Sequence, residues 1–574
     1  MEFKKTYIIL DEVDAKTFIA SKVNLKNIIS FSPNAYHHLR NTNNTIIRSS
    51  ELFDNNQHQH IAKEINKIEN KIFPVIENEK KLSRIAKEIY FNDIHAALST
   101  CYRIWEILPE SESYFVRKGS KFLEIKNKND AFLFLIKRLQ DQIPLSINIR
   151  NSSFSTIINS INSFILKALS AKNVFIFASF NYGFPWISRA IMDKEENTIF
   201  ISFSPTERRI KDLMILFVSI YSFITNKKII KLIIPPDSFQ RKKTVVAFLK
   251  LIDINHISKG LGIFMENIGI NADMGDSLAN KVDEVYREIE PKAIIVHQVR
   301  SPMALAIVDA ANRNDITSYL ASHGTHLTSN NDVCNLEQRS LARGLLASHL
   351  VEYNIVQSDL AKEAMTSFFP NLQYLEFENI NWGFSSNFSK ISRNQKVKIL
   401  HASTYKALTT FRPWIFESSD EFHKSLTELI ITMKEINDAE LIIRHREIGE
   451  MSIDTYINYI DKQSSVTIKT DQDSPFIEDL EQADIVIACF STTIEEAINI
   501  GKYVILWGGG YRYSHINNKL LNEKLIYPVY SVEELYNTIK LLIDILASKP
   551  EENFKRQLQI KDSQSKFIER LMSK

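Results

Sequence analysis

Glycine is scarce in this chain, and the glycine-rich signatures of two large enzyme classes are missing. The 574 residues include 14 glycines. No GxGxxG motif follows the first apolar run, and no GxxxxGK(S/T) motif occurs anywhere. Such loops let the backbone approach a pyrophosphate closely or cradle the phosphates of a nucleotide. Their absence argues against a dinucleotide-dependent enzyme and against a P-loop NTPase.

Cysteine is also sparse, and it forms no recognisable metal or disulfide pattern. Cys101, Cys334 and Cys489 lie far apart, and neither CxxC nor HExxH occurs. Separated thiols of odd number do not build a disulfide framework and are typical of a reducing compartment. The ligand spacing of a structural zinc site is absent. We therefore expect no cofactor and no metal, and we interpret the DxD spelling at 471–473 as a loop.

The chain has neither a charge excess nor a long hydrophobic run. Lys and Arg number 70 against 68 Asp and Glu, which disfavours nucleic acid as a partner. The longest apolar stretch, residues 213–225, is shorter than the ~17–25 residues of a transmembrane helix. The apolar run at 7–10 is too short for the core of a signal peptide. These features predict a cytoplasmic protein, for which peripheral contact with the inner face of a membrane remains open.

What the sequence does contain is an alternation of short apolar runs with helical patterns. Strands of a parallel sheet are buried on both faces and read as such runs, and strands alternating with helices predict doubly wound sheets. The expected fold is α/β. The expected strands are residues 7–10, 174–178, 198–203, 229–234, 293–297, 397–401, 440–443, 465–468, 485–488 and 503–507.

The rhythm changes at two places, which suggests the domain organisation. Residues 61–169 carry long amphipathic patterns and predict a largely helical insertion. Residues 381–394 are polar, rich in Ser and Asn, and predict a linker. We therefore expect a Rossmann-like domain over 1–385 that includes the insertion, a second over 395–545, and a terminal helix over 550–574.

Polar motifs follow several of the expected strands. His323, Gly324 and Thr325 come where a strand would end, the edge at which open α/β sheets bind ligands. Gly324 allows close backbone approach, and the imidazole of His323 can act as a base near neutral pH. A turn histidine without a chemical role is the alternative.

A second motif opens an expected helix with hydroxyl residues. Ser491, Thr492 and Thr493 follow the run at 485–488, and Glu495 falls in the first helical turn. Ser491 is a plausible N-cap, and hydroxyls with free backbone N–H groups at a helix start also suit a phosphate. Helix capping and phosphate binding are both compatible with this pattern.

Three weaker candidates remain. Ser403 and Thr404 follow the run at 397–401, and Arg444 with His445 closes the strand at 440–443, where a guanidinium fork can meet a phosphate. Gly508–Gly510 is either a flexible active-site loop or a tight strand exit. Asp11 and Glu12, after the first run, are either bases or solvated turn acids.

Taken together, these motifs resemble those of GT-B glycosyltransferases of bacterial surface-polysaccharide synthesis. This broad group includes Kdo transferases, GT-B sialyltransferases and CDP-glycerol glycerophosphotransferases. The resemblance covers about residues 320–510. It matches an HGTP-type motif at 323–325 with His326 in place of proline, an RxHP-type motif at Arg444-His445, a strand-then-Ser-Ser motif at 491–492 and an ILYAPT-type segment at 399–404.

The resemblance implies two Rossmann-like domains facing a cleft and a metal-independent glycosyltransferase. Its implied donor is a CMP-activated sugar acid of Kdo or sialic-acid type, and its implied acceptor a surface glycan or lipid-linked glycan (capsule, O-antigen or lipooligosaccharide). His323 would be the base or would orient the donor. The donor-binding set would be Ser403, Thr404, Arg444, His445, Ser491, Thr492, Thr493 and Glu495. The alternatives are a CDP-glycerol or CDP-ribitol phosphotransferase, a UDP-sugar epimerase and a non-catalytic nucleotide-sugar-binding scaffold.

Overall fold

The computed structural model describes most of the chain, with gaps between the described ranges. These ranges are residues 3–21, 27–42, 44–142, 161–162, 164–165, 173–177, 198–205, 217, 220–221, 229–234, 248–322, 324–377, 396–403, 417–444, 466–469, 476–548 and 561–572. The expected linker at 381–394, His323, Thr404, His445 and the DxD-like segment at 471–473 lie outside them.

A parallel sheet of seven strands forms the centre of the N-terminal half. Its order is β12-β11-β10-β9-β6-β7-β8, so the chain runs outward in both directions from the junction of β6 and β9. Every pairing is parallel. The strands are β6 (Asn173–Phe177), β7 (Thr198–Pro205), β8 (Ile229–Ile234), β9 (Ala293–Val296), β10 (Ser318–Ala321), β11 (Tyr353–Val356) and β12 (Tyr374–Glu376).

A second parallel sheet of six strands forms the C-terminal half. Its order, β15-β14-β13-β16-β17-β18, is again doubly wound, with the junction between β13 and β16. The strands are β13 (Val397–His401), β14 (Ala439–Arg444), β15 (Val466–Lys469), β16 (Ile485–Ala488), β17 (Tyr503–Leu506) and β18 (Ile526–Pro528). All residues of β16 are buried, which explains its continuous apolar sequence. The expected α/β class with two doubly wound sheets is therefore confirmed.

A third sheet, of five strands, was not expected. Its order is β3-β2-β1-β4-β5, and its strands are β1 (Phe3–Ile9), β2 (Ile28–Ser30), β3 (Ile46–Arg48), β4 (Ser111–Lys118) and β5 (Lys121–Ile125). The first apolar run thus forms a strand, but in this sheet and not in the seven-stranded one. Successive residues of β1 face two different cores: Ile8 lies in the large core of the N-terminal half, and Ile9 lies in a smaller core on the other face. A period of two cannot reveal which strands a segment will pair with.

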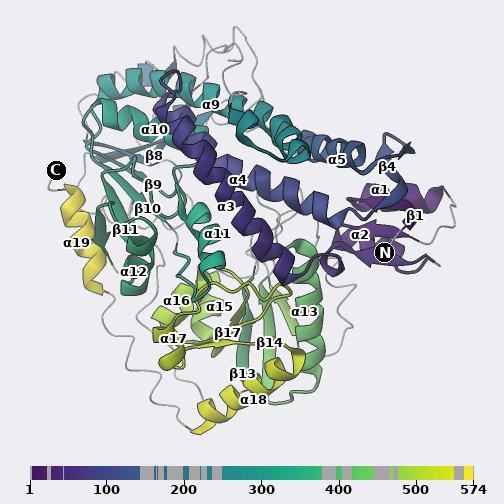
Figure 1. The fold of residues 1–574 in the computed structure, drawn as a ribbon. Helices are drawn as coiled ribbons and strands as arrows, with labels where there is room; N and C mark the ends of the chain where they lie inside the picture. The colour runs from purple at the N-terminus through teal and green to yellow at the C-terminus, as the bar shows by residue number, and fades with distance from the viewer. Residues whose placement is uncertain are drawn as a thin grey trace.

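Long helices join the third sheet to the seven-stranded one (Figure 1). They are α3 (Asn55–Asn78), α4 (Arg84–Ile107), α5 (Lys128–Gln142), α9 (Asn255–Ile289) and α10 (Pro302–Arg313). A single hydrophobic core includes these helices, one face of the five-stranded sheet and one face of the seven-stranded sheet. The described part of the expected helical insertion over 61–169 is indeed mainly helical, but it also contains the antiparallel hairpin of β4 and β5.

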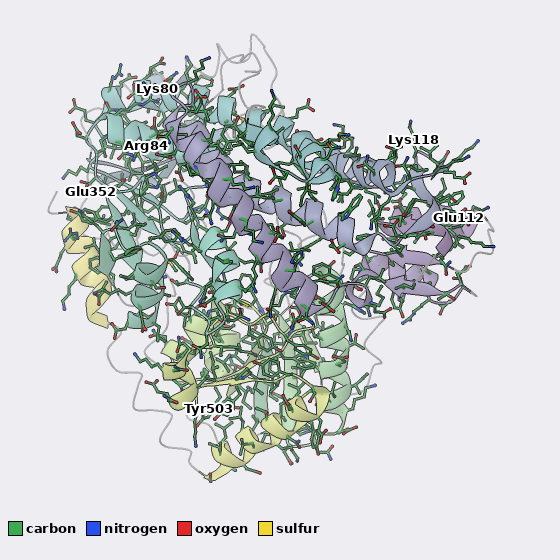
Figure 2. The ribbon with its side chains drawn as sticks, in the orientation of Figure 1. Lys80, Arg84, Glu112, Lys118, Glu352 and Tyr503 are labelled. Carbon is green, nitrogen blue, oxygen red and sulfur yellow. The ribbon has the colours of Figure 1, made fainter. Side chains whose placement is uncertain are left out.

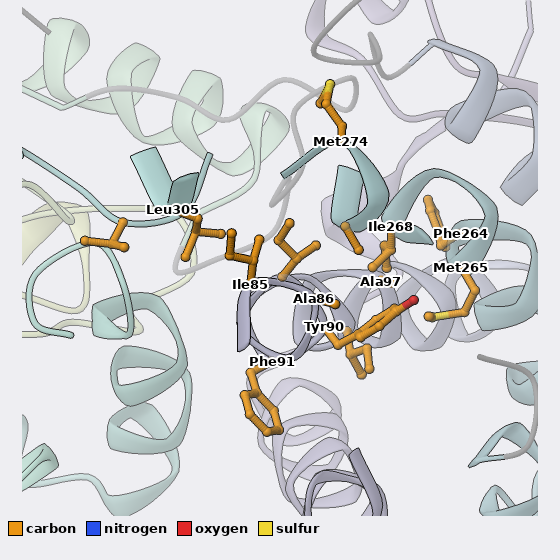
Figure 3. Close-up of a cluster of buried hydrophobic side chains, with 14 of the residues drawn as sticks. Ile85, Ala86, Tyr90, Phe91, Ala97, Phe264, Met265, Ile268, Met274 and Leu305 are labelled. Carbon is orange, nitrogen blue, oxygen red and sulfur yellow. The ribbon is translucent and has the colours of Figure 1, made fainter. Parts of the chain in front are cut away.

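The crossing of α4 and α9 shows how closely these helices pack (Figure 3). Ile85, Tyr90 and Ala97 of α4 lie among Phe264, Met265, Ile268 and Met274 of α9, and all are buried. Gly275 makes the approach at Ile85 feasible, since a Cβ there would lie 2.6 Å from Cγ2 of Ile85. The helical layer is thus a rigid support for the strand ends beside it.

The remaining helices of the two halves lie outside this helical group. The N-terminal half contains α1 (Glu12–Ala20), α2 (Pro33–Leu39), the 3-10 turn η1 (Ser49–Glu51), α11 (Asp332–Ala342) and α12 (Asp359–Phe368). The C-terminal half contains α13 (Ser419–Lys434), α15 (Phe476–Gln482), α16 (Thr493–Asn499), α17 (Asn518–Asn522) and α18 (Val532–Ser548). No helix in the described ranges is both long and apolar enough to span a membrane.

The last helix, α19 (Lys561–Met572), returns to the N-terminal half (Figure 1). Phe567, Ile568 and Leu571 pack in a separate core on the face of the seven-stranded sheet opposite to the long helices. The rings of Tyr319 on β10 and Phe567 meet edge to face at a centroid distance of 5.8 Å. The chain therefore covers this sheet with its own C-terminal segment.

Candidate active site

The turn after β10 and the loop after β16 meet between the two halves of the molecule. The backbone N–H of Thr325 donates a hydrogen bond of 2.6 Å to Oε2 of Glu495. A Cβ on Gly324 would lie 2.5 Å from Cβ of Thr492, so only glycine permits this contact. Two motifs that lie 170 residues apart in the sequence are therefore in direct contact. Two doubly wound sheets joined at their carboxyl edges form the GT-B architecture that the sequence predicted.

Glu495 is the buried carboxylate at this contact. It is 1% exposed, and its second oxygen accepts a hydrogen bond of 2.5 Å from Oγ of Ser358. Burial raises its pKa to about 7, against hydrogen bonds from Ser358 and Thr325 that lower the pKa. The carboxyl group consequently changes charge near neutral pH, which is a common property of functional sites.

The hydroxyl residues after β16 lie at the start of α16, as expected. Thr492, not Ser491, occupies the N-cap position of α16, and its side chain makes no capping hydrogen bond. Oγ of Ser491 instead accepts a hydrogen bond of 3.2 Å from the backbone N–H of Thr493. Thr492 already has helical backbone angles, so Ser491 makes the side-chain hydrogen bond expected of an N-cap, although the helix is assigned to begin one residue later. Thr492 and Thr493 are buried at this interface, and Ser491 is half-buried.

Aromatic rings pack beside the contact between Thr325 and Glu495. The imidazole of His326 stacks on the ring of Phe490, with centroids 4.2 Å apart and planes at 18°. His515, whose ring lies 6.0 Å from that of His326, is fully buried, and burial lowers its pKa to about 3. Its backbone N–H donates to the carbonyl of Leu327. Both histidines therefore belong to the contact between the halves, and His515 stays neutral there.

Gly508–Gly510 is a tight strand exit in the structure. A Cβ on Gly508 would lie 2.3 Å from Sγ of Cys489, and one on Gly509 would lie 2.6 Å from the backbone oxygen of Glu421. The exit brings the backbone N–H of Gly509 to 3.0 Å from Oε1 of Glu417. Of the two interpretations left open by the sequence, close packing is the one that these distances support.

The remaining candidates in the C-terminal sheet serve neighbouring strands and helices. Oγ of Ser403 accepts a hydrogen bond of 2.9 Å from the backbone N–H of Cys489, which ties the end of β13 to the end of β16. Arg444 is buried and pairs with Asp479 of α15 at 2.7 Å, with its guanidinium over the ring of Phe476. The polar groups of Ser403 and Arg444 therefore contact neighbouring elements of the same half, and Arg444 is buried and not at the surface.

Asp11 and Glu12 lie on the third sheet, away from the motif contact in the topology. Asp11 caps α1 through the backbone N–H of Asp14 and pairs with Arg138 at 2.7 Å. Glu12 is partly exposed, and hydrogen bonds from Lys16 and His38 lower its pKa. A carboxylate with a lowered pKa is a poorer base, so the structure favours the interpretation of these residues as turn acids.

The sequence did not reveal a buried ionic cluster formed by His58, Arg103 and Glu337. Nη2 of Arg103, on α4, lies 2.6 Å from Nδ1 of His58 and 3.2 Å from Oε1 of Glu337. Nε2 of His58 lies 2.9 Å from Oε2 of Glu337. All three are at most 1% exposed. A signal was present, because these residues occupy the apolar faces of amphipathic helices, where charges are rarely placed without a partner.

The C-terminal half adds a second buried pair close to this cluster. Arg512 and Glu421 form a bidentate pair, with nitrogen–oxygen distances of 2.9 and 2.7 Å. The charges of Arg512 and Glu421 both act on the pKa of Arg103, which burial lowers to about 10. In contrast, the charged side chains of Lys80, Arg84 and Glu352 lie at the periphery of the molecule (Figure 2). The cluster and this pair thus bring five buried charged or titratable side chains close together.

A pocket opens between these two groups of charges. It is small, with about 10 Å³ of space that solvent can occupy, which is room for about one water molecule. It is lined by Ser49, Ser50, Phe53, Arg103, Ile107, Ser418 and Glu421, which come from η1, α4 and the start of α13. Segments next to the five-stranded sheet and to the six-stranded sheet therefore meet at this pocket. No cluster of three or more metal-ligating side chains occurs within the described ranges.

Comparison with known proteins finds similarity of fold at a low level. No protein-family model matches the chain, and no curated protein matches it in sequence. A UDP-GlcNAc 2-epimerase from Neisseria meningitidis bound to UDP-GlcNAc is 11% identical with a TM-score of 0.42, covering 70% of this chain and 100% of its own. MurG from Acinetobacter baumannii is 13% identical with a TM-score of 0.37, at 70% and 100% coverage.

A further solved structure, the glycotransferase of kitacinnamycin, is 9% identical with a TM-score of 0.39 and covers 70% of this chain and 98% of its own. Similarities at this level say nothing about substrate or activity. The architecture is instead established by the strand order of the two parallel sheets.

Proposed function

We propose that this protein is a glycosyltransferase that uses a nucleotide-activated sugar. The observation that carries the proposal is the contact of the 322–326 turn with the 491–495 loop across the two sheets. In open α/β sheets ligands bind at the carboxyl ends of strands, and both segments lie there. A nucleotide bound by one half and an acceptor bound by the other would meet at this contact.

The donor that we favour is a CMP-activated sugar acid of Kdo or sialic-acid type. The support is the pattern of a histidine turn followed by a strand with paired hydroxyls, which the chain shares with that group. Ser491 and Thr492, with Thr404 and His445 on neighbouring strand ends, would contact the phosphate. Arg444 and Ser403 would support those strand ends, because their polar groups already bind Asp479 and Cys489.

The proposed reaction is a displacement at the anomeric carbon. An acceptor hydroxyl forms the new C–O bond while the bond from the anomeric carbon to the CMP phosphate oxygen breaks. The hydroxyl proton passes to the imidazole of His323, and the phosphate leaves with the electron pair of the broken bond. Hydroxyl and backbone N–H donors aimed at the leaving phosphate would stabilise its growing charge.

A panel of donors tests the proposed activity. We expect hydrolysis or transfer with CMP-Kdo or a CMP-nonulosonate and none with CDP-glycerol, CDP-ribitol or UDP-GlcNAc. Turnover of a CDP-polyol would indicate the phosphotransferase alternative, and interconversion of a UDP-sugar without acceptor would indicate an epimerase. Nucleotide binding without any turnover would leave the scaffold alternative.

The double variant Ser491→Ala with Thr492→Val tests the donor loop. Thr492 makes no capping bond and Ser491 makes one, to the backbone N–H of Thr493, so a stability loss of up to about 2 kcal/mol is expected. The affinity for CMP should fall by more than this stability loss would explain. Ser531→Ala, which removes the Oγ acceptor for the backbone N–H of Glu534, is the matched control elsewhere in the same half. Unchanged CMP affinity in a folded double variant would place the nucleotide elsewhere.

A further inference from the structure

The two doubly wound halves are joined beside the end of β10. The backbone N–H of Asn330 donates to the carbonyl of Ile516 at 2.8 Å, and the backbone N–H of His515 donates to the carbonyl of Leu327. One hydrophobic core continues across this region, with residues of β11 and α12 from the N-terminal half and residues of β16, α16 and β17 from the C-terminal half. We call this region the core contact. Main-chain hydrogen bonds and a shared apolar interior thus join the halves here.

A second contact is made by the five-stranded sheet. Both α2 and η1 pack against α13. Asp420, in the first turn of α13, is 1% exposed, and both of its carboxylate oxygens are bound from the N-terminal half. Nε of Arg48 donates to Oδ1 at 2.7 Å, and the backbone N–H of Ser50 donates to Oδ2 at 3.2 Å. We call this region the clasp contact. A carboxylate of the C-terminal half therefore occupies the carboxyl edge of the third sheet, where open α/β sheets bind ligands.

Closely packed helices connect the two contacts within the N-terminal half. α3 and α4 run between the seven-stranded and the five-stranded sheet (Figure 1), and one hydrophobic core includes them. His58 of α3 and Arg103 of α4 both bind Glu337 of α11. That helix begins directly after the core contact, since its N-cap is Asn331. Packed interiors transmit displacement with little compression, so the two contacts cannot shift independently of each other.

Two contacts at separate places oppose the hinge rotation by which many two-domain proteins open. A rotation about the core contact would pull Arg48 away from Asp420 and leave a buried charge without its partner. A rotation about the clasp contact would expose apolar residues of the shared core to water. Domains move relative to one another by default unless a large hydrophobic interface joins them. Here a shared core is reinforced by a buried ion pair at a second place.

We propose that the five-stranded sheet is a clasp that holds the two doubly wound halves in one fixed arrangement, so that ligands bind without rotation of one half against the other. This inference is independent of the proposed function, because it depends on contacts of the protein with itself and not on any donor or acceptor. The third sheet thereby has a mechanical role.

The native cysteines provide reporters for this proposal. Cys101, Cys334 and Cys489 are all buried, and a buried thiol reacts with an alkylating reagent only when the structure around it opens. Cys101 lies in the core of the N-terminal half and reports unfolding of that half. Cys334 lies in the first turn of α11, directly after the core contact. Burial raises the pKa of its thiol, and the nearby charge of Arg512, from the C-terminal half, lowers it. Cys334 therefore reports separation at the core contact.

Ser49→Cys adds a reporter at the clasp contact. Ser49 is 3% exposed and lines the small pocket together with Ser418 and Glu421 of the C-terminal half. With rates normalised to those of the denatured chain, Cys334 and the introduced thiol should be protected to within ~10-fold of Cys101. Millimolar CMP should leave this protection unchanged. Weaker protection at either reporter, with or without CMP, would show that the halves separate and would overturn the clasp, whether or not the protein transfers any sugar.

Asp420→Ala in the same background tests the ion pair. It should raise alkylation of the thiol introduced at position 49 by at least ~10-fold and leave Cys101 protected. Glu64→Ala, which breaks the exposed pair with Lys67 on α3, is the matched control and should change neither rate. An unchanged rate at position 49 in Asp420→Ala would overturn the clasp.

A milder variant decides the case in which Asp420→Ala unfolds, which faster alkylation of Cys101 would reveal. Arg48→Lys keeps a positive charge opposite Asp420 but loses the Nη2 donor to its backbone carbonyl. The thiol introduced at position 49 should then react several-fold faster while Cys101 stays protected. An unchanged rate at position 49 in Arg48→Lys would overturn the clasp.

Discussion

Arg48, the last residue of β3, forms a buried ion pair with Asp420 in the first turn of α13. Its Nε lies 2.7 Å from Oδ1 of Asp420, and Nη2 also donates to the backbone carbonyl of that residue at 2.9 Å. The backbone N–H and hydroxyl of Ser50 bind the other carboxylate oxygen. The carboxyl edge of the third sheet is thereby docked onto the C-terminal half, beside the pocket.

The first prediction concerns this docking. Asp420→Ala should lower stability by about 3–5 kcal/mol, because it leaves the buried guanidinium of Arg48 without its partner. Glu64→Ala, which breaks the exposed pair with Lys67, should cost less than about 1 kcal/mol. Thermal unfolding midpoints measure both. The double variant Arg48→Met with Asp420→Ala should cost less than the sum of the single changes, and strict additivity would contradict a direct pair.

The second prediction concerns the contact of Gly324 with Thr492. Gly324→Ala should destabilise by about 1–3 kcal/mol through overpacking and lower turnover, because its Cβ would lie 2.5 Å from Cβ of Thr492. Adding Thr492→Gly removes that atom and should restore part of the stability. Gly269→Ala on α9, where the nearest atom lies 3.8 Å away, is the control and should be neutral or stabilising. Failure of Thr492→Gly to rescue would refute the contact.

The third prediction follows from Glu417, whose pKa burial raises to about 7. A buried acid with a raised pKa favours the folded state when it is protonated. Its contribution is therefore lost as the pH rises from about 4.5 to 7. This amounts to about 3 kcal/mol for one such group. Glu417→Gln should match the wild type in unfolding midpoint at pH 5 and exceed it at pH 8. Parallel pH curves for the two proteins would show that Glu417 is ionised throughout.

The fourth prediction separates structure from binding at Arg444. Arg444→Met removes one charged partner of Asp479, which Lys469 still contacts at 2.6 Å. We expect a stability loss of about 1–3 kcal/mol with little change in nucleotide affinity. Arg444→Lys can keep the ion pair, so its stability should lie between that of the wild type and that of Arg444→Met. A tenfold loss of CMP affinity in a stably folded Arg444→Met variant would instead place the guanidinium on the donor.

Much of the fold could be predicted from the sequence, since parallel strands buried on both faces have a distinctive composition. The run at 485–488 is a strand because all of its residues are apolar and buried. The short strands β2 and β3 were missed, since three residues show no period. β4 was missed because its alternation, with Tyr114 and Val116 buried, lies between long helical patterns.

The motifs that meet between the halves were selected for a related reason, and their roles in a site stay predictions. The turn at Gly324 and Thr325 and the loop at Thr492 and Glu495 were selected because strand ends of one sheet share an edge. The roles of Arg444 and Ser403 could not be read in this way. A strand-end arginine has the same local sequence whether its partner is a phosphate or Asp479 of the next helix.

The sequence alone determined the α/β class, the two doubly wound sheets and the strand ends that carry polar residues, because these depend on local periodicity. Only the tertiary structure decided what depends on contacts far apart in the chain. It placed β1 in a third sheet and paired Arg48 with Asp420, 372 residues away. It also gathered His58, Arg103 and Glu337 into one buried cluster. Burial makes these charges significant, and burial is a property of the assembled fold.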